Sequence, residues 1–245
     1  MSLFFNQQIP FYNLLIGIGI IAGFKCFEKN EKLFNSNDQF IKKYKEWIII
    51  TLLICSFIGA AIFENIYHND FSSIGKYGIT FYGGLITASV LSIFLLKFSI
   101  NRFELMFNLL APSVLIAHAF GRLGCFLAGC CYGKYFYELN FMANCLHEIR
   151  FPIQLAEAII LFIGFLIINK YITFEKRYLT YLLFYGISRF FLEFLRADDR
   201  GFFLFNFLAP SQVISLLIIT IILFRFYFIR KKRLSINFIN SLINS

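Results

Sequence analysis

The sequence predicts an all-α, polytopic integral membrane protein with seven transmembrane helices. The chain of 245 residues is 59% hydrophobic and carries 35 Phe, while only 15% of its residues are charged. A single water-soluble core cannot cover that much apolar surface, so lipid must cover the rest. The chain also repeats apolar runs close to the roughly 20 residues that are needed to cross a bilayer. Together these observations exclude a soluble globular domain.

Seven apolar runs account for most of the chain. In chain order they cover residues 9–24, 47–63, 79–96, 105–127, 153–168, 178–194 and 209–224. The first run does not fit the usual criteria for a cleaved signal peptide, because no Lys or Arg precedes it and no small-residue cleavage site follows it. We expect a single transmembrane domain over residues 1–245, without a second domain or an internal repeat.

Basic residues orient the predicted helices, because cytoplasmic loops of membrane proteins accumulate Lys and Arg. One side of the bundle carries Lys25, Lys29, Lys32, Lys42, Lys43, Lys45, Lys97, Arg102, Lys170, Lys176, Arg177, Arg225, Arg230, Lys231, Lys232 and Arg233. The other side carries Lys76, Lys134, Arg150, Arg196 and Arg200. This asymmetry predicts an outward-facing N-terminus, a cytoplasmic loop at 25–46, a short extracytoplasmic segment at 129–151 and a cytoplasmic tail at 230–245. The net charge of +9 is therefore mostly a topology signal and gives no argument for nucleic-acid binding.

Polar residues inside the apolar runs share one end of the predicted bundle. With this topology, the outer end is the start of the odd-numbered runs and the finish of the even-numbered runs. The residues there are Tyr12, Glu64, Asn65, Tyr82, His118, Arg122, Gln154, Glu157, Tyr185, Arg189, Glu193, Ser211 and Gln212. Scattered structural polar residues would have no reason to share one leaflet, so we expect a cavity that opens toward the outer surface.

The run at 178–194 carries one polar stripe. Its members stand at i, i+4, i+8 and i+11, which places them within about a quarter of the helix circumference; they are Tyr185, Arg189, Glu193 and Arg196. Arg189 and Glu193 alone would be equally consistent with a pair that only neutralises itself, since many buried pairs are structural. The additional Arg196 favours an anion-binding site.

The run at 105–127 places His118, Arg122 and Cys125 on one face, at i, i+4 and i+7. A core histidine is the plain interpretation of His118, but an intramembrane Arg beside it favours a functional role equally. A neighbouring stripe of small residues would let a helix or a lipid headgroup approach the backbone closely, and tight helix packing explains it as well. That stripe consists of Ala117, Gly121, Gly124 and Ala128.

Four cysteines lie at or beyond the outer end of this run: Cys125, Cys130, Cys131 and Cys145. An oxidising compartment would permit disulfides among them. A catalytic thiolate at Cys125, next to Arg122, is a second interpretation. A zinc site is disfavoured, because vicinal cysteines plus His147 lack the usual paired spacing.

Six short motifs follow one another along nearly the whole chain: Ile9-Pro-Phe-Tyr12, Tyr82-Gly-Gly-Leu-Ile86, Gly121-Arg-Leu-Gly-Cys-Phe-Leu-Ala-Gly129 through Gly133, Phe151-Pro-Ile-Gln-Leu-Ala-Glu157, Tyr185-Gly-Ile-Ser-Arg-Phe-Phe-Leu-Glu193 through Arg196, and Ser211-Gln212. In this order they resemble the motifs of the prolipoprotein diacylglyceryl transferase family, in a divergent cysteine-rich branch. The resemblance implies a seven-helix protein of the bacterial cytoplasmic (inner) membrane with an outward-facing site.

The resemblance also implies a reaction, the transfer of diacylglycerol from phosphatidylglycerol to the lipobox cysteine thiol of a secreted lipoprotein precursor, with release of glycerol phosphate. No metal or organic cofactor is implied. Arginines would hold the phosphate and stabilise the leaving group, and a base would deprotonate the acceptor. The expected catalytic residues are His118, Tyr82, Arg122, Arg189, Glu193 and Cys125. The expected substrate-binding residues are Tyr12, Gly83, Gly84, Gly121, Gly124, Gly133, Gln154, Glu157, Tyr185, Arg196 and Gln212.

The chain departs from the family pattern mainly where the acceptor would be activated. Tyr82 and Phe151 stand for histidines, Cys125 and Ala128 for asparagines, Cys130 for a glutamate and Ala61 for an arginine. Two other functions therefore stay open. One is a related lipid transferase with another acceptor, using His118 as base or Cys125 as nucleophile. The other is a lipid-binding or transport protein without chemistry, in which transport is least favoured because no polar path to the cytoplasm is visible.

Overall fold

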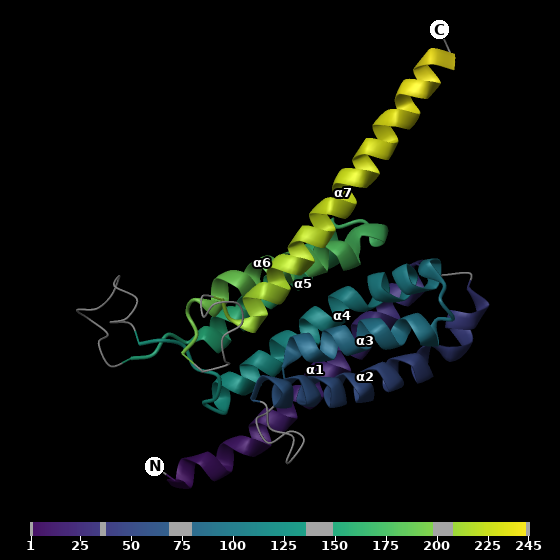
Figure 1. The fold of residues 1–245 in the computed structure, drawn as a ribbon. Helices are drawn as coiled ribbons and strands as arrows, with labels where there is room; N and C mark the ends of the chain where they lie inside the picture. Colours follow the sequence, from purple (N-terminus) through teal and green to yellow (C-terminus); the bar gives the residue numbers. More distant parts are fainter. Residues whose placement is uncertain (1, 35–37, 69–79, 136–148, 198–207, 244–245) are drawn as a thin grey trace.

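The computed structural model describes residues 2–34, 38–68, 80–135, 149–197 and 208–243, with side chains placed within 11–34, 38–66, 80–135, 149–197 and 208–227. The described chain is built from helices (Figure 1). In order they are α1 (Ser2–Phe34), α2 (Gln39–His68), α3 (Phe81–Leu95), α4 (Ile100–Leu127), α5 (Ile153–Tyr171), the 3-10 turn η2 (Phe174–Lys176), α6 (Arg177–Glu193) and α7 (Pro210–Ile243).

Each predicted run falls on one of these seven α-helices, which confirms the all-α class. Three helices are longer than the predicted apolar runs. Residues 25–34 and 39–46, within the expected cytoplasmic loop, belong to α1 and α2, and α7 continues through the expected tail to Ile243. Hydropathy detects only the part of a helix that lipid covers, whereas Lys, Glu and Gln extend a helix into water with little loss of helix propensity.

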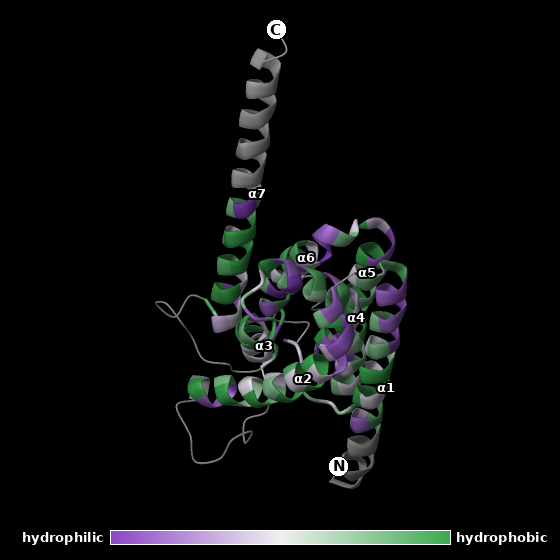
Figure 2. Ribbon diagram, turned by 90° about the vertical axis from the view of Figure 1, so that its right-hand side faces the viewer, coloured by the Kyte–Doolittle hydropathy of each residue, from purple (hydrophilic) through white to green (hydrophobic). Residues whose placement is uncertain are grey.

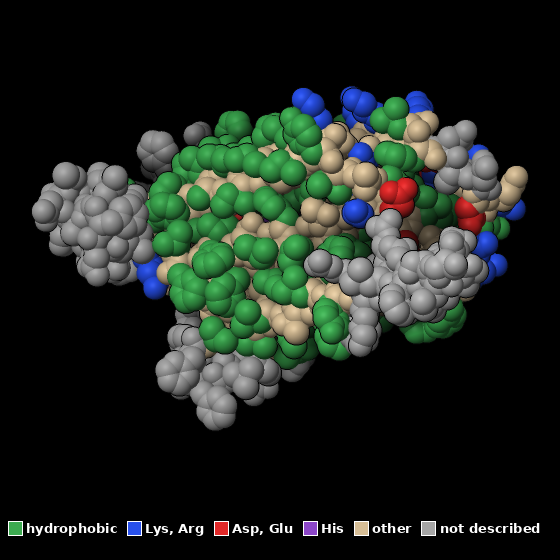
Figure 3. Space-filling model, turned by 90° about the horizontal axis from the view of Figure 1, so that it is seen from above, with side chains coloured by type: hydrophobic (Ala, Val, Ile, Leu, Met, Phe, Trp, Pro, Cys, Tyr) green, Lys and Arg blue, Asp and Glu red, His purple; other side chains and the backbone are tan. Residues whose placement is uncertain are grey.

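Five helices of the described chain are long and apolar enough to cross a membrane: α1, α2, α4, α5 and α7. Helix α3 is apolar but has only 15 residues. Helix α6 has 17 and carries Tyr185, Arg189 and Glu193 of the predicted polar stripe, whereas Arg196 lies beyond its end. Hydrophobic residues dominate most of the helices (Figure 2). Hydrophobic side chains also cover much of the face seen in Figure 3, where Lys and Arg gather mainly toward one end. This is the surface of a polytopic membrane protein.

Helix α4 organises the bundle, because it contacts α1, α3, α5 and α6, while α2 pairs with α3 and α6 with α7. Close approach of α1 to α4 depends on two glycines. A Cβ atom at Gly19 or Gly23 would lie 2.9 Å from the carbonyl oxygen of Ala117 or Ser113, respectively. Figure 1 shows that the starts of the odd-numbered helices and the ends of the even-numbered helices meet at one end of the bundle. That end collects the predicted polar residues.

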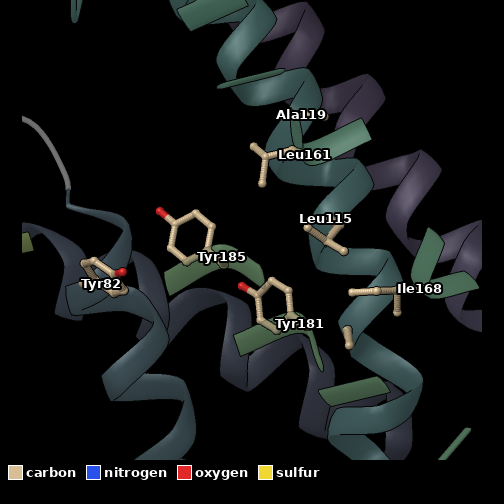
Figure 4. Close-up of a cluster of buried hydrophobic side chains, with 8 residues drawn as sticks. Tyr82, Leu115, Ala119, Leu161, Ile168, Tyr181 and Tyr185 are labelled. Carbon is tan, nitrogen blue, oxygen red and sulfur yellow. The ribbon is translucent and has the colours of Figure 1, made fainter. Parts of the chain in front are cut away.

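Two apolar clusters fill the bundle. One is formed by Phe27, Ile48, Leu52, Leu96, Met106, Phe107 and Leu109. The other lies between α3, α4, α5 and α6 and is formed by Tyr82, Ala111, Leu115, Ala119, Leu161, Ile168, Tyr181 and Tyr185 (Figure 4). Two tyrosines of the second cluster, Tyr82 and Tyr185, belong to the predicted site, so this cluster joins the site to the apolar core.

Candidate functional site

A carboxylate between two guanidinium groups forms the centre of the polar site. Oε1 of Glu157 on α5 lies 3.1 Å from Nε of Arg122 on α4, and Oε2 lies 3.6 Å from Nη1 of Arg196, just after α6. The exposed fractions are only 1% for Glu157, 8% for Arg122 and 5% for Arg196. Desolvated charges of this kind are tolerated only when they are paired. Glu157, expected to bind substrate, thus positions two of the predicted phosphate-binding arginines.

A second buried pair lies on α6. Nη2 of Arg189 is 2.6 Å from Oε2 of Glu193, as expected from their i, i+4 spacing. Nη1 of Arg189 is also buried but has no hydrogen-bond partner among the described residues. Leaving a charged donor unsatisfied is costly, so this atom indicates a ligand acceptor. Three arginines and two glutamates in the two groups leave an excess of one positive charge, which an anion would balance.

Aromatic rings form one wall of the site. The imidazole of His118 stacks on Phe81 with ring centroids 4.1 Å apart, and the ring of Tyr185 lies 5.6 Å from it. Nδ1 of His118 and the hydroxyl of Tyr185 are buried and lack hydrogen-bond partners within the described parts of the chain. Two polar groups on neighbouring helices are therefore free to meet a substrate. Phe81 was not predicted, since nothing in the sequence distinguishes it from the other phenylalanines.

The hydroxyl of Tyr82, an expected catalytic residue, bonds to a side chain of α7. Its hydroxyl lies 2.6 Å from Oγ of Ser215 on α7, and Ser215 donates its own proton to the carbonyl oxygen of Ser211 at 2.7 Å. A serine hydroxyl has one proton, so Tyr82 donates to Ser215. Figure 4 shows the Tyr82 ring beside that of Tyr185, within the second apolar cluster. Ser215 was missed, although its i+4 spacing from Ser211 was a usable signal.

The N-terminal helix reaches the site through Tyr12. A Cβ atom at Gly124 would lie 3.1 Å from the Tyr12 ring, so this glycine lets α1 and α4 approach each other. Gly121, one turn earlier, has nothing within 4 Å of the position a Cβ would take. The stripe of small residues thus serves helix packing at Gly124, whereas at Gly121 it leaves space beside the backbone, as expected for the approach of a headgroup.

Two other predicted substrate glycines are used for helix packing. A Cβ at Gly83 would lie 2.6 Å from Cβ of Phe63, and a Cβ at Gly84 would lie 3.1 Å from the carbonyl oxygen of Ser56. Both contacts are with α2, and they explain why α2 and α3 pair closely. The geometry therefore gives Gly83 and Gly84 a packing role, and their expected contact with substrate stays a prediction.

The chain after α4 is tied to two neighbouring segments. Isolated antiparallel bridges join Gly133 to Arg196 and Tyr135 to Arg150. At Gly133 a Cβ would lie 2.5 Å from the carbonyl oxygen of Phe151, a separation that real side chains do not show. Gly133 thus acts through the backbone, because its close packing holds Arg196 at the site.

Two predicted glutamines support helix ends. Nε2 of Gln154 donates to the carbonyl oxygen of Cys130 at 2.5 Å, which ties α5 to the chain after α4. Oε1 of Gln212 accepts from the backbone N–H of Ala209 at 3.0 Å and so caps the start of α7. Both side chains are buried. Their expected role in substrate binding stays a prediction, whereas the hydrogen bonds show that they hold the backbone at Cys130 and Ala209.

Three cysteines come together at the C-terminal end of α4. The Sγ atoms of Cys125, Cys130 and Cys131 all lie within 4.8 Å of one another. The chain reverses at Gly129, with φ +66°, and at Cys131, with φ +57°. A non-glycine residue in this left-handed conformation costs on the order of 1–3 kcal/mol, so the surrounding structure must hold it there. The five cysteines in the described ranges form no disulfide with one another, and Cys145 lies outside these ranges.

The three thiols also interact through hydrogen bonds and electrostatics. Hydrogen bonds from Cys125 and Cys130 lower the pKa of the Cys131 thiol well below its ordinary value, and the nearby guanidinium groups of Arg122 and Arg196 act in the same direction. A thiolate is the reactive form of cysteine and also its metal-binding form. The cysteine cluster thus lies close enough to Arg122 and Arg196 for their charges to act on it.

These features define the class of protein: a polytopic helical membrane protein with a buried cluster of arginines and glutamates at one end of its bundle. Comparison with known proteins identifies the family. The family profile of prolipoprotein diacylglyceryl transferase matches residues 1–228. The chain belongs to this family, as its motifs predicted.

Three curated relatives extend the match over most of the chain. All carry the name phosphatidylglycerol–prolipoprotein diacylglyceryl transferase, the second with the suffix 2. The Clostridium tetani protein is 32% identical, over 91% of this chain and 94% of its own length. The Clostridium perfringens protein is 30% identical, over 88% and 89%. The Streptococcus uberis protein is 30% identical, over 86% and 87%.

Proposed function

We propose that this protein transfers diacylglycerol from phosphatidylglycerol to the lipobox cysteine of lipoprotein precursors. The observation that carries the proposal is the cationic cluster of Arg122, Arg189 and Arg196, with Nη1 of Arg189 lacking a partner among the described residues. A phosphate diester carries one negative charge, which matches the single positive charge that the cluster has in excess. The names of the relatives and the family match support the same reaction.

In the reaction, the acceptor sulfur attacks the glyceryl carbon that is esterified to the phosphate. A C–S bond forms, the C–O bond to the phosphate breaks, and its electron pair leaves on glycerol phosphate. Arginines 122, 189 and 196 stabilise the charge that builds on this leaving group. The acceptor proton goes to a base, and His118 is the candidate, because its buried Nδ1 has no partner in the described residues.

We further propose seven membrane crossings, with the N-terminus outside and the C-terminus in the cytoplasm of a bacterium. The short helices α3 and α6 lie beside the longer α2 and α7, which supports their crossing as pairs. The excess of Lys and Arg at the opposite end from the site supports the orientation. Lipid and secreted precursor would then reach the site from the outer leaflet.

The direct test mixes the purified full-length protein with phosphatidylglycerol and a lipobox peptide and analyses the products by mass spectrometry. We expect a thioether-linked diacylglyceryl peptide and an equal amount of glycerol phosphate. The matched control is the same peptide with Ser in place of Cys, which should give neither product. No thioether product from folded protein with an intact Arg189 would refute the proposal.

A different acceptor is the second candidate, because Tyr82 occupies a histidine position of the family pattern and gives its proton to Ser215. This candidate predicts release of glycerol phosphate without lipidated peptide. The variant Tyr82→His separates the two. Faster thioether formation in the variant would show that this position limits acceptor activation in the native chain.

A further inference from the structure

We propose that Cys125, Cys130 and Cys131 bind a Zn²⁺ ion whose open fourth position takes the acceptor cysteine as a thiolate. The inference deepens the proposed function, because it concerns how the same site activates its acceptor. It rests first on geometry: the three Sγ atoms lie within 4.8 Å of one another. Tetrahedral zinc with Zn–S bonds of about 2.3 Å requires sulfurs about 3.8 Å apart, so the thiols need to close by only about 1 Å.

The backbone around the cluster is already fixed for this arrangement. The N–H of Cys130 bonds to the carbonyl oxygen of Cys125 at 3.2 Å, and the Cys130 carbonyl accepts from Gln154. Just beyond Cys131, the carbonyl oxygen of Tyr132 accepts from the N–H of Ala197 at 3.3 Å. Three segments thus position the cysteines, including Cys131 with its left-handed backbone. A metal site held this way is organised before the ion binds.

The ligand count identifies a catalytic type of site. Structural zinc sites are closed by four protein ligands, whereas catalytic sites have three and leave one position for water or substrate. Within the described ranges, no fourth His, Cys, Asp or Glu joins the three thiols. A substrate thiol fits the open position, because zinc binds sulfur well and a coordinated thiol is deprotonated outright. Cys130 is exposed, so an acceptor can reach the metal from outside.

Charge and position link the cluster to the lipid site. Zinc with three thiolates is anionic, and a fourth thiolate adds another negative charge, so such a site favours cationic neighbours. Cys125 follows Arg122 by one helical turn, so a thiolate on the metal is next to the proposed phosphate position. As its sulfur binds the metal, the acceptor thiol loses its proton to water at the exposed side of Cys130, so the metal takes over the deprotonation that was assigned above to His118. That sulfur then attacks the glyceryl carbon, and the neutral thioether product, a weaker ligand, leaves.

The sequence argued against zinc because the cysteine spacing is not paired. The reversal at Gly129 and Cys131 removes that objection, since it returns the chain to the last turn of α4 and brings adjacent cysteines to the same point as Cys125. The site also coincides with positions where the chain departs from the family pattern. A metal that activates the acceptor would replace polar groups that are missing from those positions.

The first test measures metal content of the full-length protein in detergent, after reduction, stripping and dialysis against Zn²⁺. We expect one Zn²⁺ per chain in the wild type and in the control Cys55→Ala, which changes a cysteine on α2. Affinity should fall about tenfold or more in Cys125→Ala, Cys130→Ala and Cys131→Ala, with unchanged melting curves in the apo form. Absence of stoichiometric zinc from the reduced wild type would overturn the inference.

The second test uses the wild type alone, so it does not depend on variants that fold. Co²⁺ replaces Zn²⁺, and its thiolate charge-transfer absorption reports the number of bound sulfurs. A lipobox peptide should strengthen this absorption, and the Cys→Ser peptide should leave it unchanged. Equal spectra with the two peptides would refute the open position.

The third test separates this inference from the proposed function. Metal-stripped protein should form thioether product at least about tenfold more slowly than the same protein reloaded with Zn²⁺. An undiminished rate without metal would overturn the inference and leave the transferase function standing. Zinc binding and the cobalt response to the Cys peptide, without any thioether product, would support the metal site and refute the transferase.

Discussion

Two ends of the bundle bury arginine in opposite ways. At the end away from the polar site, Arg177 donates to Oδ1 of Asn30 at 3.0 Å and to the carbonyl oxygens of Asn169 at 2.9 Å and Ile172 at 3.4 Å. At the end that holds the polar site, Arg189 is paired with one carboxylate, and its Nη1 lacks a hydrogen-bond partner among the described residues. Both side chains are buried, with 5% and 2% of their surface exposed.

The difference shows how to distinguish a structural charge from a ligand-binding one. Nε, Nη1 and Nη2 of Arg177 each donate to an oxygen, in α1, in α5 or in the residue that follows α5. This arginine therefore connects helices. The cluster at the other end has three arginines against two glutamates, and Nη1 of Arg189 has no hydrogen-bond partner among the described residues. A buried group that the protein leaves incomplete is the better candidate for contact with substrate.

The largest expected effect comes from removing the carboxylate that two arginines share. Glu157→Ala leaves Arg122 and Arg196 buried without their counter-charge, which should lower the free energy of unfolding by about 3–5 kcal/mol. Thermal unfolding in detergent measures the loss. The control is Glu104→Ala, because the Glu104–Arg225 pair is exposed and such pairs contribute about 0–1 kcal/mol. Equal effects of the two variants would contradict the central role of Glu157.

Arg189→Ala should lower turnover per folded molecule, in addition to the loss of stability from leaving buried Glu193 without its counter-charge. Removing one donor to a developing negative charge costs about 10²–10³ in rate, so release of glycerol phosphate should fall by this factor. Arg225→Ala, which removes an exposed arginine from α7, is the control and should retain the wild-type rate. Loss of lipid binding in Arg189→Ala, with no turnover in any protein, would favour a lipid-binding protein without chemistry.

Arg177→Ala should affect stability alone. Hydrogen bonds from a charged donor contribute about 1.5–3 kcal/mol, so the melting temperature should fall while turnover per folded molecule stays unchanged. Lys170→Ala, at an exposed position of the last turn of α5, is the control for loss of a positive charge. A specific loss of turnover with normal stability would remove the distinction between the two ends.

The smallest expected effect concerns the hydroxyl pair between α3 and α7. Tyr82→Phe should cost about 0.5–1.5 kcal/mol of stability, as expected for one neutral hydrogen bond. A double-mutant cycle with Ser215→Ala isolates the pair, and the second substitution should add little once the first is made. Additive losses would mean that the two hydroxyls act independently.

Composition and periodicity predicted the helices and the end of the bundle where the polar groups gather. The stripe on α6 also predicted the Arg189–Glu193 pair, because i, i+4 neighbours on a helix meet without help from other segments. The bridge through Glu157 was not predicted. Its three members belong to α4, α5 and the chain after α6, and nothing in local spacing specifies which carboxylate lies opposite which arginine.

The arginine site shows the same division between what local sequence specifies and what packing specifies. By itself, the sequence determined that charged side chains lie at one end of an apolar bundle, since hydropathy and charge asymmetry are properties of single segments. Only the tertiary structure decided that Glu157 joins two arginines, that Tyr82 bonds to α7, and that three cysteines meet. These contacts depend on how closely helices approach each other and on one chain reversal, and both are set by packing between segments that are far apart in sequence.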